Sequence, residues 1–453
     1  MEPKDTTKQA ETTGDDFGFT PSEQRSIIHK IDRRLITGLG ILFGVSLMDR
    51  TNLGNASIAG MQQELKLNVG ARYSIVLLIF FIPYVIVQFP SSIVVRKVGA
   101  RKFLAGITFA WGVVMIKGFG FVHDWKVMLG LRVILGAFEA GLFPGAIYLL
   151  SLWYTRYEVH KRYSSFYLIS VIGGSLSGVL AYGFMQMAGL AGLAAWKWIF
   201  IMEGILTCVL AVVGFLLLVS FPQDVQKSRN FLSSREIEFV LWRIEQDRQD
   251  VEEEPFTLSA FMKPALEWKV WGFAIIFFKL GFGVGASQAL STPPYFFAGV
   301  VMYVEGWLGD KWHLRSPIII YNSLQTILGL CLLEWVASPG VQYFGIFLVA
   351  SGSNANIPAV LAWQANNIRG QWKRAFCSAS MITCGGTGGI IGAVVYRSQD
   401  APTFFPGVIT SIALNFLIIA LAVMLTLYFH KANGKAQQGR IAIEGLPGFQ
   451  YTL

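Results

Sequence analysis

The sequence is poor in charged residues, histidine and cysteine, and each shortage excludes a class of protein. Only 14% of the 453 residues are charged and 53% are hydrophobic, which is too apolar for an ordinary soluble domain. The four cysteines lie inside apolar stretches, where cysteine acts as a small hydrophobic residue, so they predict neither a disulfide framework nor a metal site. Five histidines without a nucleophile–base cluster make an enzyme the least favoured interpretation.

The chain has instead a long series of apolar stretches, each near the length of about 20 residues that crosses a bilayer core as a helix. These stretches predict an all-α integral membrane protein with about twelve spans, two of them crowded between Val270 and Trp307. The other spans are expected at Leu35–Ile58, Tyr73–Val95, Phe103–Phe121, Val127–Trp153, Ser164–Met187, Trp198–Val219, Pro317–Trp335, Val341–Trp363, Phe376–Val395 and Pro406–Phe429.

Polar segments divide the series into two halves of six helices, residues 35–220 and 269–430. Residues 1–34 carry no apolar signal core and are expected to be a disordered cytosolic tail. Residues 221–268 are expected to be a cytosolic linker, with a helical pattern between Arg235 and Ile244. Residues 431–453 are expected to be a second cytosolic tail.

The net charge of +9 is spread over short basic clusters between the apolar stretches, which argues against nucleic-acid binding and for membrane orientation. With a cytosolic amino terminus, the short inside loops hold twelve lysines and arginines and the outside loops five. We therefore expect both termini in the cytosol and an even number of spans. The membrane is expected to be the plasma membrane. The inside set is Arg96, Lys97, Arg101, Lys102, Arg156, Lys161, Arg162, Lys311, Arg315, Arg369, Lys373 and Arg374; the outside set is Lys66, Arg72, Lys126, Lys197 and Arg397.

One loop motif occurs twice, at residues 92–102 and, as Gly306-Trp-Leu-Gly-Asp310-Lys311-Trp-His-Leu-Arg315, after the presumed eighth span. The two copies resemble the cytoplasmic loop signature of the major facilitator superfamily, although Arg96 stands in the first copy where the family usually has an acid. Asp310, Lys311 and Arg315 are expected to form a gating loop, because such charges can pair with neighbouring helix ends and stabilise one conformation. Ordinary basic clusters of inside loops are the alternative.

Further strings resemble the fungal allantoate permease branch of the anion:cation symporters. They are Asp49-Arg50-Thr-Asn-Leu-Gly-Asn, Phe138-Glu139-Ala-Gly-Leu-Phe-Pro144-Gly-Ala, Trp196-Lys-Trp-Ile-Phe-Ile-Met-Glu203-Gly and Ala362-Trp-Gln-Ala-Asn366-Asn367. The resemblance extends to Glu444-Gly-Leu-Pro-Gly-Phe near the end of the chain. It implies a monomeric importer without a cofactor, which takes up a carboxylate such as allantoate, nicotinate or a related vitamin together with protons.

The charged residues inside the spans support a transport site independently, because an ionisable group in a bilayer must be paired or face water. Arg132 and Glu139 fall at i and i+7, so they share one helix face about 10 Å apart. Asp49 and Arg50 should lie at comparable depth. Two acids and two bases can neutralise one another, and an anion with protons can replace those partners. A permanent salt bridge between helices is the alternative.

The resemblance assigns roles to these residues. Asp49 and Glu139 match proton-carrying acids, Arg132 matches the arginine that binds the substrate carboxylate, and Arg50 matches the partner of the acid on the fourth helix. Asn366 and Asn367 could hydrogen-bond a substrate or join helices. A different vitamin as substrate, or a nutrient sensor or inactive remnant that keeps the fold without transport, remain the competing hypotheses.

The chain departs from its resembled family at the seventh helix. Between Trp271–Phe278 and Lys279–Phe282 roughly twenty residues, most of one span, are absent relative to related chains. We expect a shortened seventh helix and poor transport, with insertion preserved.

Overall fold

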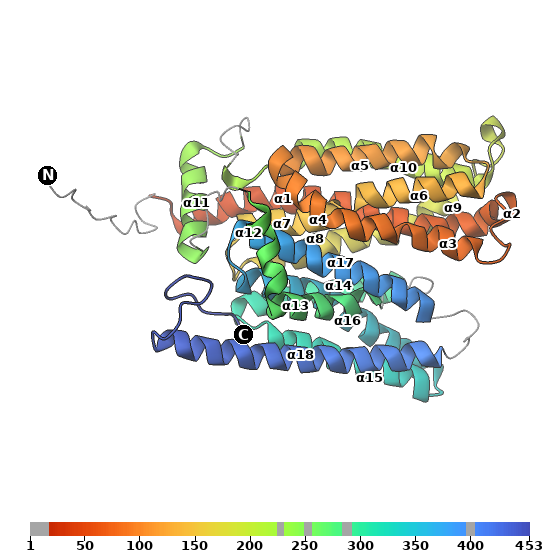
Figure 1. Cartoon of the computed structure of the whole chain (residues 1–453). Coiled ribbons are helices and arrows are strands. Elements are labelled where there is room, and N and C mark those ends of the chain that lie inside the picture. Colours follow the sequence, from red (N-terminus) through yellow and green to blue (C-terminus); the bar gives the residue numbers. More distant parts are fainter. Residues whose placement is uncertain (1–17, 224–230, 249–255, 283–291, 396–403) are drawn as a thin grey trace.

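The computed structural model describes residues 18–223, 231–248, 256–282, 292–395 and 404–453, and its regular structure in these ranges is helical apart from one isolated bridge near the end of the chain. Long antiparallel helices form two groups that lie side by side (Figure 1). The expected all-α class is therefore confirmed.

The N-terminal half contains the helices from α1 to α10, and the C-terminal half those from α13 to α18. The N-terminal bounds are α1 Pro21–Ala56, α2 Gln62–Glu64, α3 Arg72–Ile79, α4 Phe81–Val98, α5 Ala100–Lys117, α6 Trp125–Glu139, α7 Leu142–Trp153, α8 Val159–Ser175, α9 Ser177–Met185 and α10 Ala195–Leu217. The linker carries α11 Ser234–Arg248 and α12 Leu258–Met262. The C-terminal bounds are α13 Trp268–Phe282, α14 Thr292–Lys311, α15 Ser316–Trp335, α16 Pro339–Asn367, α17 Gln371–Val395 and α18 Phe405–Gln437.

Nine helical stretches within the described ranges are long and apolar enough to cross a bilayer by themselves. Three of these each combine two α-helices, α3 with α4, α6 with α7, and α8 with α9. The helix predicted in the linker is confirmed as α11.

Helix α1 begins at Pro21 and so includes the last part of residues 1–34, the predicted cytosolic tail. Thr20 caps this helix: its hydroxyl accepts from the Glu23 amide at 3.3 Å, and the Glu23 carboxylate accepts from the Thr20 amide at 2.8 Å. This reciprocal capping box lets a polar first turn be helical ahead of the apolar span. At the other end α18 continues to Gln437 and so includes the first seven residues of the predicted tail, 431–437.

Two helices, α13 and α14, occupy the crowded region where two spans were expected. The described part of α13 has 15 residues, about 22 Å of helix, and residues 283–291 lie outside the described ranges. This helix approaches α17 so closely that a Cβ on Gly388 would lie 1.7 Å from the Phe278 carbonyl oxygen. The missing side chain of Gly388 therefore permits close packing of α13 against α17.

Helix α11, the beginning of α1 and the end of the chain all lie at the same end of the molecule, which we call the linker side (Figure 1). Hydrogen bonds join the two halves on the linker side, where Arg374 Nη1 at the start of α17 donates to the Ser151 carbonyl at 3.0 Å. Another, from Thr383 Oγ1 to Gln88 Oε1 at 2.9 Å, lies near the middle of α17. The conformation is thus one in which the halves are joined on the linker side.

Candidate functional site

Helices α1 and α6 bring the four predicted charged residues into one buried region of the N-terminal half. Asp49 and Arg50 lie two turns before the end of α1, and Arg132 and Glu139 share one face of α6. The exposed fractions of Asp49, Arg132 and Glu139 are only 2%, 4% and 1%, so each charge depends on protein partners rather than water.

Two residues of α1 contact the carboxylate of Glu139. Its Oε2 accepts a hydrogen bond from Ser46 Oγ at 2.9 Å and forms an ion pair with Arg50 Nε at 3.5 Å. The Arg50 guanidinium also donates to the Tyr84 hydroxyl at 3.0 Å. The Arg50 side chain keeps 30% of its surface exposed whereas Glu139 is fully covered, so the pair has one face that an incoming anion can reach.

Asp49 has different neighbours from those expected. Its carboxylate accepts from the Trp111 indole at 2.8 Å and from the Asn52 amide at 3.4 Å. Among the described residues neither arginine forms an ion pair with it. The four charges therefore share one region, but only Arg50 and Glu139 are in direct contact.

Arg132 lies over the Phe119 ring, with its Cζ 5.4 Å from the ring centroid. Its Nε and Nη2 atoms have no hydrogen-bond partner among the described residues, and the same holds for Oε1 of Glu139. A buried guanidinium without a partner is costly unless an anion or water satisfies it. The Nε and Nη2 atoms of Arg132 can therefore donate hydrogen bonds to an anionic group.

Gly136 permits this arrangement. A Cβ at this position would lie 2.2 Å from the Phe80 carbonyl oxygen and 3.1 Å from Pro83 Cγ. The absence of a side chain lets α6 approach the junction of α3 and α4, the same junction that carries Tyr84 and so positions Arg50.

The second copy of the loop motif joins the halves on the linker side. Asp310 forms an ion pair with Arg315 at 2.7 Å and accepts from the Lys161 backbone amide, at the start of α8, at 2.8 Å. Arg315 in turn donates to the Arg156 carbonyl at 3.2 Å. Lys311, by contrast, lies over Trp307 of its own helix, 4.9 Å from the ring centroid.

The first copy of the motif, residues 92–102, makes the matching contact from the N-terminal half to the C-terminal half. Arg96 donates a hydrogen bond to Gln371 at the start of α17 and lies 4.2 Å from the centroid of the Trp372 ring. Each loop thus reaches from its own half to the other half. The arginine that replaces the usual acid retains this contact through a neutral glutamine partner.

Asn366 and Asn367 lie at the linker-side end of α16, away from the charged centre on α1 and α6. Asn367 donates to the Thr452 carbonyl at 3.0 Å and accepts from the Thr452 amide at 2.7 Å. The polar atoms of the Asn366 side chain have no hydrogen-bond partner in the described part of the chain. The two asparagines therefore differ, because the side chain of Asn367 is occupied by the end of the chain.

Sequence reasoning missed several residues that complete the centre. Tyr84, Trp111 and Phe119 lie within apolar stretches, where one aromatic residue looks like another until the helices are packed. In the described residues no group of three or more His, Cys, Asp or Glu side chains is placed to hold a metal ion.

Comparisons with known proteins agree with this architecture. Residues 39–393 match the Major Facilitator Superfamily. The MFS-type transporter cnsO of Penicillium expansum is 30% identical over 85% of this chain and 79% of its own length. The major facilitator-type transporter hxnP of Emericella nidulans is 27% identical over 93% of this chain and 89% of its own length. The solved structure of the proton:xylose symporter XylE covers 89% of this chain and 96% of its own, with a TM-score of 0.66 and 13% identity, a likeness of fold.

Proposed function

The chain belongs to the Major Facilitator Superfamily and is a multi-pass membrane transporter, and we propose that it carries a small organic anion into the cell together with protons. The observation that carries the proposal is the buried pair of Glu139 with a partly exposed Arg50, beside Arg132, whose Nε and Nη2 have no hydrogen-bond partner among the described residues. A cation that is buried without a partner favours an anionic substrate, and an acid that shares its cation can exchange charge with that substrate.

The coupling follows from competition for Arg50. While Arg50 faces Glu139, the carboxylate is compensated. A substrate carboxylate that binds the two arginines takes Arg50 away from Glu139, and a carboxyl left without a cation inside the bilayer is stable only with a proton. Substrate binding and proton uptake thereby favour each other. Release of both on the opposite side lets Arg50 return to Glu139.

Asp49 is proposed as a second proton carrier. Its carboxylate accepts from the Trp111 indole and the Asn52 amide, and no cation among the described residues forms an ion pair with it. The two acids are then in unequal environments, with Glu139 coupled directly to the arginine that meets substrate.

The substrate class is proposed from the sequence resemblance: a carboxylate such as allantoate, nicotinate or a related vitamin or nitrogen compound. Asn366 and Asn367 are proposed as further substrate contacts, at the linker-side end of the path rather than at the charged centre. Asn367 can take this role only after Thr452 leaves. Both termini are proposed to lie in the cytosol from the lysine and arginine count. Uptake, at the plasma membrane, is proposed from the sequence resemblance. A sensor or inactive remnant is favoured only by the shortened region of the seventh helix.

The test is Glu139→Gln in protein reconstituted in liposomes with a radiolabelled carboxylate. We expect exchange of internal for external substrate to persist, because glutamine resembles the protonated acid, and accumulation driven by a proton gradient to fall to background. Glu203→Gln is the matched control, because Glu203 is equally buried on α10 but forms no ion pair among the described residues. Equal loss of exchange and accumulation in a folded Glu139→Gln protein contradicts the assignment.

A further inference from the structure

The segment from Gln438 to Leu453 folds back from α18 on the linker side and ends beside the helices of the C-terminal half (Figure 1). It turns at Gly439, whose φ of 70° is accessible to glycine at little cost. Ile443, Phe449, Tyr451 and Thr452 are buried, so the segment is part of the folded transporter rather than a free tail. It is fixed at three places.

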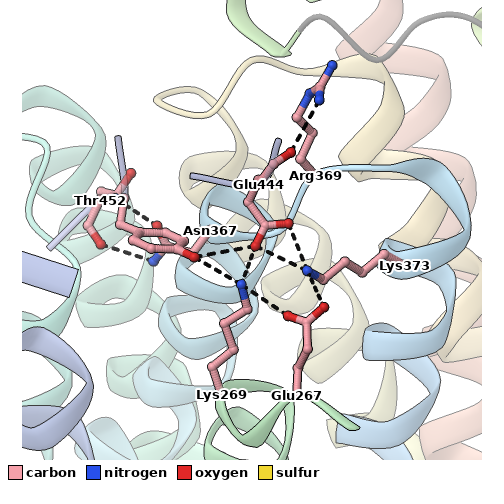
Figure 2. A network of polar contacts seen from close by, with 8 residues as sticks. Glu267, Lys269, Asn367, Arg369, Lys373, Glu444 and Thr452 are labelled. Carbon is pink, nitrogen blue, oxygen red and sulfur yellow. Dashed lines mark hydrogen bonds and ion pairs between the residues drawn. The ribbon is translucent and has the colours of Figure 1, made fainter. Parts of the chain in front are cut away.

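The first place is Glu444, which lies in a cluster of charges on the C-terminal half (Figure 2). Its carboxylate contacts Lys269 of α13 and pairs with Lys373 of α17 at 2.8 Å. Glu267 bridges the same two lysines, at 3.1 and 2.7 Å. Burial alone would raise the pKa of Glu444, but the two ammonium groups outweigh it and hold the pKa below its usual value. The attachment is therefore complete above the ordinary carboxyl range and weakens only in more acidic solution.

The second place is the backbone of the last residues. Asn433 donates to the Tyr451 carbonyl and accepts from the Tyr451 amide, each at 2.8 Å. Asn367 makes the same reciprocal pair with Thr452, and the Trp363 indole adds a bond to the Thr452 carbonyl at 2.9 Å. These side chains satisfy the peptide groups as a neighbouring strand would, so the backbone of the segment has a definite binding site.

The third place is on the other half. Arg156, between α7 and α8, donates to the Gln450 carbonyl at 3.2 Å, and its Cζ lies 4.7 Å from the centroid of the Phe449 ring. The same arginine pairs with Asp247 of the linker helix at 3.2 Å and accepts from Arg315 through its carbonyl. Arg156 therefore joins the N-terminal half to the linker, to the gating loop and to the end of the chain.

We propose that residues 438–453 form a latch that favours the conformation closed on the linker side. Opening on this side must separate the ends of α7 and α8 from the C-terminal half. The segment is anchored to that half by Glu444 and Thr452, so opening must break its contacts with Arg156. Contacts present in one of two conformations shift the population toward that conformation. The inference rests on alternation between two conformations and not on the proposed anion or protons.

The latch can be tested in detergent-purified full-length protein with spin labels at Lys102 and Trp312, which are exposed on the linker side of the two halves. Distances between the labels are measured by pulsed electron resonance without substrate or proton gradient, so failure of the proposed transport activity does not affect the outcome. Three variants are compared: a chain that ends at Gln437, Phe449→Ala, and Arg440→Ala as the control. Arg440 lies on the exposed turn of the same segment.

We expect the ratio of long to short distances to rise about tenfold in the shortened chain, equivalent to about 1.4 kcal/mol. In Phe449→Ala the ratio of long to short distances should also rise. The segment should stay bound in this variant through Glu444 and Thr452. Arg440→Ala should match the parent, and a synthetic peptide of residues 440–453 should restore short distances to the shortened chain. Distances unchanged in both Phe449→Ala and the shortened chain, or an equal shift in Arg440→Ala, overturn the latch.

Discussion

Substitution of Gly136 by alanine tests whether the close approach of α6 positions the charged centre. The new Cβ would lie 2.2 Å from the Phe80 carbonyl oxygen, more than 1 Å inside ordinary contact, and the obstacle is backbone rather than a flexible side chain. Overpacking of this kind costs about 1–3 kcal/mol. The Phe80 carbonyl also accepts the Tyr84 amide at 3.3 Å, so displacement there moves the tyrosine that holds Arg50.

We therefore expect Gly136→Ala to lower both the thermal unfolding temperature of the purified protein and its uptake rate. Gly130→Ala on the same helix is the control, because a Cβ there meets no atom within 4 Å, and alanine is the better helix former by about 1 kcal/mol. Uptake should fall by about tenfold or more in Gly136→Ala, since a displacement near 1 Å is large for a binding site. A Gly136→Ala protein as stable and active as Gly130→Ala would refute this reasoning.

Two further predictions concern the substrate site and the seventh helix. Arg132→Lys should lose most transport although the charge is kept, because a planar guanidinium holds a carboxylate with two bonds and an ammonium does not; near-normal affinity in an uptake assay would make Arg132 structural. Insertion of a full-length seventh helix from a close relative between Phe278 and Lys279 should raise uptake severalfold at equal expression, since that helix is expected to line the cavity; robust transport by the present chain would remove this explanation.

The fold was largely predictable because each span is a long apolar stretch and the bilayer sets its length. That Arg132 and Glu139 lie together was predictable from helix periodicity, because residues seven positions apart share a helix face at any packing of α6. The partners of Asp49 were not predictable. Trp111 is one aromatic residue among many in apolar stretches, and only the packing of α5 against α1 places its indole at the carboxylate.

Two other features of the structure could not be predicted from the apolar pattern alone. The beginning of α1 carries a local signal, the capping box of Thr20 and Glu23, which averaged hydropathy conceals. The docking of the final segment has no local signal, because Glu444 meets Lys269 and Lys373 across 175 and 71 positions of sequence. Such contacts follow from the tertiary arrangement alone.

The most direct test of the central claim is proton movement in liposomes that contain the purified chain and a pH-sensitive dye inside. Addition of a transported carboxylate outside, with no imposed gradient, should acidify the interior as protons enter with the anion. The Glu139→Gln protein, which is expected to keep substrate exchange, should give no acidification. Acidification of the same size in both proteins, or substrate entry without any change in internal pH, would contradict proton coupling through Glu139.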